Sequence, residues 1–170
     1  MSNAIANGII HEFNRRVHEE NVGKIESMLS KLTKDEIWHK ENNHSNSVGN
    51  LVLHLCGNVR QWICSGIGKE KDIRQRDKEF QIGYNLDAGE LVARLRQLKS
   101  ETDAALDGLS DEQLLDKRKV QGYDETVVSI IIHVTEHFSY HTGQIAMVTK
   151  WLKDEDLEFY KGVDLNAVGN

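Results

Sequence analysis

Hydrophobic residues recur every three or four positions in four stretches of this chain, which is the pattern of helices that bury one face. The four stretches cover about residues 4–32, 47–63, 87–108 and 125–152. The chain contains no proline, the residue that most often interrupts a helix. Four long helices joined by polar connections predict an all-α fold, specifically a four-helix bundle.

Capping residues mark where the predicted helices begin. Ser47 and Asp87 directly precede two of the apolar stretches, and their side-chain oxygens can accept hydrogen bonds from the free backbone N–H groups of a first helical turn. Thr33 and Glu36 have the spacing of a capping box and predict a short extra helical turn at residues 36–38. The bundle should therefore have a minor helical element between its first two long helices.

The connections between the predicted helices are long and polar. Residues 69–80 are dense in charge and are interpreted as a solvated connection with no place in the core. Residues 117–126 are interpreted as a turn-rich connection. The polar tail that follows the last helix is expected to pack loosely on the bundle through Leu157, Phe159 and Tyr160.

Composition limits the class of protein. The chain has 170 residues, 39% hydrophobic and 28% charged, and no internal repeat divides it, so residues 1–170 are expected to form a single globular domain. No apolar run approaches the roughly 18 residues that a membrane-spanning helix needs. A net charge of -6 argues against a nucleic-acid partner, because such binding depends on neutralising phosphates. The N-terminal residues lack the regions of a secretory signal, so the cytoplasm is the expected location.

Histidines provide the candidate chemistry. His133, His137 and His141 stand four residues apart, so in one helix each is rotated by only about 40° from the last and all three share a flank. His54 lies among the apolar positions of the second predicted helix and should face the bundle interior. Three nitrogen ligands are typical of catalytic zinc sites that leave a fourth position open. The spacing leaves open which histidines of the last helix are used, and whether all are ordinary hydrogen-bonded core residues.

Three neighbouring residues are candidates for the surroundings of such a site. Asn58 follows His54 by one helical turn and could hydrogen-bond a ligand, a substrate or the core. Tyr140 and Gln144 flank the histidines of the last helix and are candidates for supporting the ligands or lining a substrate cleft. No residue stands out as a general base, which favours chemistry that a metal ion supports unaided. The other histidines are expected at the surface or in loops: His11, His18, His39 and His44.

Two segments carry a family resemblance, SVGNLVLHLCGNVRQWI (Ser47 to Ile63) and HVTEHFSYHTGQIAMV (His133 to Val148). Together with the charged stretch GKEKDIRQRDKEF (Gly68 to Phe80), they resemble the DinB-like superfamily of bacterial metal-binding four-helix bundles, and in particular an uncharacterised branch of it. The ligands that this resemblance implies are His54, His137 and His141. It therefore argues against His133 as a ligand.

Relatives in this superfamily bind zinc or nickel, often dimerise, and include bacillithiol S-transferases and mycothiol-dependent maleylpyruvate isomerase. The resemblance thus implies one divalent metal ion, zinc or nickel, a low-molecular-weight thiol as co-substrate, and a homodimer. It favours a metal-dependent enzyme that transfers a metal-activated thiol to a small-molecule substrate. The alternatives are a metal-dependent hydrolase and a protein that binds a metal or ligand without catalysis.

Overall fold

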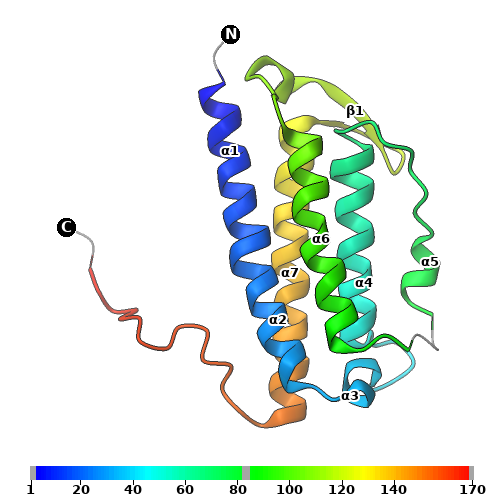
Figure 1. Ribbon diagram of the computed structural model, residues 1–170, viewed down its shortest axis with the longest axis vertical. Coiled ribbons are helices and arrows are strands. Elements are labelled where there is room, and N and C mark those ends of the chain that lie inside the picture. The colour runs from blue at the N-terminus through cyan, green and yellow to red at the C-terminus, as the bar shows by residue number, and fades with distance from the viewer. Residues whose placement is uncertain (1–2, 82–84, 169–170) are drawn as a thin grey trace.

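Four long helical segments lie side by side in the computed structural model of this chain, which describes residues 3–81 and 85–168 (Figure 1). The elements that form them are α1 (Ala4–Asn14), η1 (Arg15–Asn21), α2 (Val22–Lys31), α4 (Val48–Val59), η2 (Arg60–Ser65), α6 (Ala88–Leu106) and α7 (Val127–Lys153). The first segment joins α1 and α2 through η1, and the second joins α4 to η2; both η1 and η2 are wider, π-helical stretches. The predicted four-helix bundle is confirmed.

The predicted caps are present at the starts of three helices. Ser47 and Asp87 each accept a hydrogen bond from the backbone N–H three residues further on, over 3.1 Å and 2.9 Å respectively. Thr33 caps the short helix α3 (Lys34–Trp38), which is the extra helical turn expected from the sequence. Local sequence therefore determines where these helices begin.

The charged connection is not purely solvated, and the prediction for residues 69–80 is wrong in this respect. It contains α5 (Arg76–Glu79), a single turn that packs against α4. Glu79 is only 8% exposed. A charged run usually forms a solvated face, but this carboxylate is buried because it meets cationic and imidazole partners inside the molecule.

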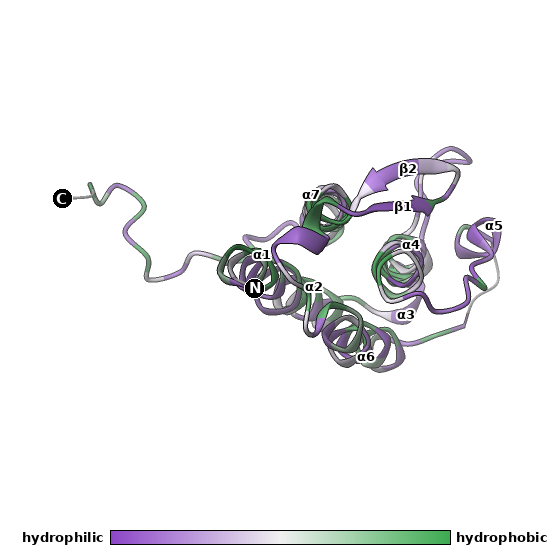
Figure 2. Cartoon of the chain, turned by 90° about the horizontal axis from the view of Figure 1, so that it is seen from above, coloured by the Kyte–Doolittle hydropathy of each residue, from purple (hydrophilic) through white to green (hydrophobic). Residues whose placement is uncertain are grey.

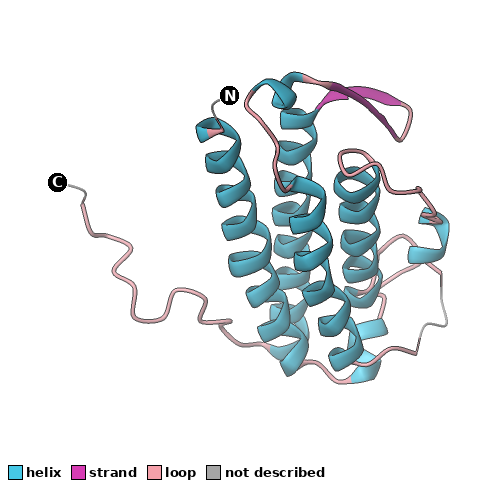
Figure 3. Ribbon diagram, turned by 45° about the horizontal axis from the view of Figure 1, so that its top comes forward, coloured by secondary structure: helices cyan, strands magenta, loops and turns pink. Residues whose placement is uncertain are grey.

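The turn-rich connection before α7 forms a short β-hairpin, which the hydrophobic pattern did not indicate. After a 3₁₀ turn, η3 (Glu112–Leu115), strand β1 (Lys117–Val120) pairs antiparallel with β2 (Tyr123–Thr126). The two turn residues have positive φ, 52° at Gln121 and 86° at Gly122, as a type I′ hairpin turn requires. Figure 3 shows the hairpin at one end of the bundle, beside the start of α7.

One continuous apolar cluster fills the space between the helical segments. α4 is buried along nearly its whole length, because α3, α5, α6 and α7 all contact it. Figure 2, which looks along the bundle, shows α5 outside α4, and its hydrophilic colour contrasts with the apolar colour of α4. None of the helices in the described ranges is long and apolar enough to cross a membrane.

The tail after α7 contacts the bundle through a few side chains. Leu157 is buried and Phe159 is half-buried. The Nζ atom of Lys24 lies 5.8 Å from the centre of the Phe159 ring and 5.4 Å from that of Tyr160. The expected loose docking is confirmed, and the following residues extend away from the bundle (Figure 1).

Candidate metal centre

Three histidines from α4 and α7 meet at one point inside the bundle. The candidate ligand atoms of His54, His137 and His141 all lie within 4.8 Å of one another. The Nε2 atoms of His54 and His137 are 3.0 Å apart. His54 and His141 are only 5% and 9% exposed. Nitrogens from three side chains therefore converge, as the ligands of one ion must.

The packing of α4 against α7 explains this convergence. His137 and His141 are one turn apart on α7 and both meet the ring of His54, with ring centres 5.0 Å from it. His133, one turn earlier, lies outside the group of three. Its ring contacts Trp62, with centres 4.1 Å apart, and stacks on His137 at 5.6 Å. Helical spacing alone left four candidates, and the contact between the two helices brings three of them together.

Glu79 fixes the orientation of His54. Its Oε2 accepts a hydrogen bond from Nδ1 of His54 over 2.8 Å. Because an ionised carboxylate only accepts, Nδ1 carries the proton and Nε2 keeps its lone pair for a metal. Arg74 donates to both oxygens of Glu79, over 2.7 Å and 2.8 Å. Burial acts to raise the pKa of Glu79, but the hydrogen bonds from Arg74 and His54 outweigh it and lower that pKa.

Gln144 holds His141 in a similar way. Its Oε1 lies 2.7 Å from Nδ1 of His141, so the ring donates through Nδ1 and presents Nε2 to the centre. Burial, and then the neighbouring histidines, lowers the pKa of His137 to about 3. Burial also lowers the pKa of His141. Imidazole binds metals in its neutral form, so these two side chains are in the ligand form at neutral pH.

The donor set fits a divalent metal ion. Neutral imidazoles are suitable ligands for zinc, nickel, copper and iron. Nitrogen ligands bound to a tetrahedral ion at about 2.0–2.1 Å lie roughly 3.3 Å from one another. The 3.0 Å between the two Nε2 atoms of His54 and His137 is close to that separation. Three protein ligands also leave a position for a further molecule.

A cavity of about 340 Å³ opens beside the three histidines. His54 and His137 form part of its wall, so a molecule in the cavity would lie next to an ion held by them. Asn58, expected near the site, is 4% exposed and also lines this cavity. Tyr140 contacts His141 edge to face but is 62% exposed and lines a different cavity.

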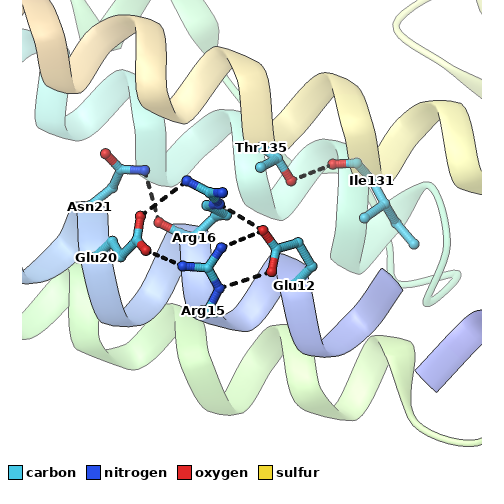
Figure 4. Close-up of polar contacts among 7 residues, drawn as sticks. All are labelled: Glu12, Arg15, Arg16, Glu20, Asn21, Ile131 and Thr135. Atoms are coloured by element: carbon cyan, nitrogen blue, oxygen red, sulfur yellow. Dashed lines mark hydrogen bonds and ion pairs between the residues drawn. The ribbon is translucent and has the colours of Figure 1, made fainter. Parts of the chain in front are cut away.

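That second cavity is larger, about 880 Å³, and lies between α1, η1 and α7. None of the three histidines contributes to its wall. Four charged side chains at or beside its edge compensate one another, because Arg15 and Arg16 both form ion pairs with Glu12 and Glu20 (Figure 4). Its size alone therefore does not make it the candidate reaction site.

His18 departs from the prediction that it lies at the surface. It is half-buried, and its Nε2 lies 2.9 Å from Oγ1 of Thr102. That hydroxyl donates to the backbone oxygen of Lys99, so it accepts from Nε2–H of His18. Burial lowers the pKa of His18 to about 4. His18 is therefore a neutral histidine at the edge of the core. The other histidines expected at the surface are exposed: His11, His39 and His44.

Sequence reasoning missed Arg74 and Glu79 because they lie in a stretch that looks like ordinary charged surface. One signal for them was Gly57, in the middle of an apolar helix and three residues after His54. A Cβ atom at Gly57 would lie 2.0 Å from Oε1 of Glu79 and 3.0 Å from Nε of Arg74. A glycine inside a helix costs stability, and it often marks the close approach of another group.

Comparisons with known proteins agree with this architecture. The family described as "Protein of unknown function (DUF1572)" matches residues 5–161. This chain belongs to that family. No curated protein matches this DUF1572 member.

Two solved structures have the same fold as this DUF1572 protein. A DinB-like protein from Bacillus cereus ATCC 10987 is 15% identical, with a TM-score of 0.65 over 86% of this chain and 91% of that chain. A DinB-like protein from Bacillus subtilis is 19% identical, with a TM-score of 0.65 over 90% of this chain and 97% of that chain. The DinB-like resemblance is thus confirmed, and these similarities concern the fold alone.

Proposed function

We propose that this DUF1572 protein binds one divalent metal ion, zinc or nickel, through His54, His137 and His141 and acts as a metal-dependent S-transferase. The observation that carries this proposal is the convergence of three imidazoles beside a cavity. Glu79 and Gln144 support it, because each fixes the second nitrogen of one histidine. Structural zinc sites usually have four protein ligands, so a three-ligand set favours chemistry over a structural role.

The chemistry divides between the ion and the chain. When bound, the ion supplies Lewis acidity, which lowers the pKa of a thiol or water molecule next to it. The histidines and their partners Glu79 and Gln144 supply a fixed geometry, and the cavity holds a small-molecule substrate. In the proposed transfer, a low-molecular-weight thiol loses its proton to solvent and its sulfur bonds to an electrophilic carbon. The leaving group departs with the electrons of the broken bond.

Elemental analysis tests the metal site. Wild-type protein exposed to zinc or nickel and then dialysed should retain one ion per chain, whereas His54→Ala and His141→Ala should retain little. His44→Ala, in an exposed loop, is the matched control and should behave as wild type. Circular dichroism should show that all variants keep their helices, because the core is apolar. Undiminished metal in both site variants would exclude the proposed ligands.

A turnover assay separates an enzyme from a binding protein. Zinc- or nickel-loaded protein should transfer L-cysteine to 1-chloro-2,4-dinitrobenzene, and His137→Ala should abolish the reaction while His44→Ala does not. Hydrolysis of 4-nitrophenyl acetate without thiol would instead favour a metal-dependent hydrolase. Metal retention with neither reaction would favour a non-catalytic metal-binding protein.

We also propose that the protein is a cytoplasmic homodimer with no nucleic-acid partner. Met147 and Trp151 on α7 are 70% and 68% exposed, and a second copy could bury them. Cys56 and Cys64 are both free, as in a reducing compartment. The net charge of -6 disfavours nucleic acid. Light scattering coupled to size exclusion measures the assembly, and a monomer at micromolar concentration would contradict the dimer.

A further inference from the structure

The cavity beside the three histidines is built from parts of the chain that are far apart in sequence. α4 and η2 supply Asn58 and Trp62, α7 supplies His133, and the hairpin strand β2 supplies Tyr123 and Glu125. Figure 3 shows the hairpin beside one end of the bundle. The volume of about 340 Å³ is at the lower end of the roughly 300–1,000 Å³ typical of small-molecule sites.

Two arginines and one carboxylate are the charged groups of the cavity wall. The charge of Arg74 is balanced, because Glu79 accepts from it through both oxygens. The carboxylate of Glu125 accepts a hydrogen bond from Oγ of Ser129 over 2.7 Å. Arg76 forms no ion pair within the described ranges 3–81 and 85–168, and its guanidinium carbon lies 5.0 Å from the centre of the Phe80 ring. Arg76 is therefore the cation of this wall that is available to a bound anion.

Aromatic rings give the cavity a flat side. The rings of Trp62 and His133 have centres 4.1 Å apart and planes inclined by 35°. The ring of Tyr123 stacks on Trp62 with centres 6.3 Å apart and planes inclined by 29°. The ring of Trp62 is therefore already in contact with both of these rings, and Tyr123, which is 59% exposed, is the outer ring on which a planar ligand can extend the stack.

Two buried polar groups of the wall lack a protein partner. Oδ1 of Asn58 and Nε1 of Trp62 form no hydrogen bond within the described part of the chain, although these residues are only 4% and 5% exposed. Buried groups without a partner are costly, and water commonly serves them. A ligand that offers an acceptor to Trp62 and a donor to Asn58 could replace that water. The cavity thus has directional polar contacts as well as a cation and flat walls.

We propose that this cavity recognises a small molecule with a planar, unsaturated body and a carboxylate group. The carboxylate pairs with Arg76, the planar body stacks on the exposed ring of Tyr123, and the buried groups of Asn58 and Trp62 provide hydrogen bonds. This inference rests on the proposed function for its reactive partner, because the planar body would lie against the wall that His54 and His137 form. The substrate of the proposed transferase is accordingly a planar carboxylic acid with an electrophilic carbon.

Three probes of similar size test this recognition: benzoate, benzamide and cyclohexanecarboxylate. Each is titrated into the full-length, zinc-loaded protein while the indole N–H resonance of Trp62 is followed by ¹⁵N–¹H NMR, with Trp62→Phe identifying the signal. Benzoate should shift that resonance and bind about tenfold more tightly than either analogue. In Arg76→Gln the preference for benzoate over benzamide should fall to about twofold or less. Arg96→Gln, which removes an exposed arginine paired with Glu26, should keep it.

Equal binding of benzoate and benzamide, or a preference that survives in Arg76→Gln, would overturn the inference. An unmoved Trp62 resonance would do the same, because the two buried groups would then be served by water alone. Repeating the titration after chelation separates this inference from the metal site. If the wild-type protein fails to retain zinc in the elemental analysis but still shows the Arg76-dependent preference, carboxylate recognition is supported and the metal function is refuted. Zinc retention without the preference refutes only the recognition.

Discussion

Replacing Glu79 with glutamine tests how the structure holds His54. The two oxygens of Glu79 accept three hydrogen bonds, one from His54 and two from Arg74. Glutamine has a single acceptor oxygen, which can keep two of these bonds if it takes the position of Oε2. Its amide group then faces Nε of Arg74, so that a donor meets a donor. The guanidinium also loses its charged partner, although the Arg74 side chain is only 5% exposed.

The magnitudes follow from this geometry. Loss of one charge-assisted hydrogen bond costs about 1.5–3 kcal/mol. Removing one partner of a buried ion pair costs about 3–5 kcal/mol when no bonds remain. Since Glu79→Gln keeps two bonds, we expect the free energy of unfolding to fall by about 2–3 kcal/mol. Metal affinity should fall by about 10–100-fold, because a neutral amide oxygen accepts from Nδ1 of His54 more weakly than the carboxylate does and leaves Nε2 a less basic ligand.

Urea denaturation of the metal-free protein and competition with a chelating dye measure the two effects. The control is Glu101→Gln, whose partner Arg60 has a side chain 36% exposed. Partly exposed pairs contribute about 0–1 kcal/mol, so this control should change stability little and metal affinity not at all. If Glu79→Gln folds and binds metal as tightly as wild type, Glu79 does not position His54. A loss of stability alone would assign Glu79 a purely structural role.

Three further predictions concern the close approach at Gly57, acid stability and the core. Gly57→Ala should weaken metal binding in the dye assay as Glu79→Gln does, because the added Cβ would lie 2.0 Å from Oε1 of Glu79. Burial lowers the pKa of His18 from 6.5 to about 4. The unfolded chain therefore takes up a proton first, and the contribution of His18 to the free energy of unfolding should be constant above about pH 6.5 and fall from there to about pH 4. When the free energy of unfolding is measured by denaturation across this pH range, it should fall less steeply in His18→Gln than in wild type. Phe138→Ala, fully buried on α7, should lower the free energy of unfolding by about 3–5 kcal/mol, whereas exposed Tyr140→Ala should change it by about 0.5 kcal/mol or less in urea denaturation.

The sequence by itself determined the helices and the set of candidate histidines. Helical periodicity and capping depend on residues a few positions apart, so Ser47 and Asp87 begin their helices as expected. The same local geometry places His137 and His141 on one side of α7. The interior position of His54 in its predicted helix made it a candidate third ligand, and the family resemblance then set His133 aside. The grouping of His54, His137 and His141 in the structure agrees with that selection.

Only the tertiary structure decided what surrounds these histidines. Whether Glu79 is solvated or buried depends on the path of a connection 25 residues after His54 in the chain, and no local pattern encodes that path. The hairpin escaped prediction because its strands are short and polar, and they form against each other and the bundle. The burial of His18 likewise depends on Thr102, which a different helix supplies. Contacts within a helix depend only on the spacing of neighbouring residues in the sequence. Contacts between distant segments form only when the whole core packs.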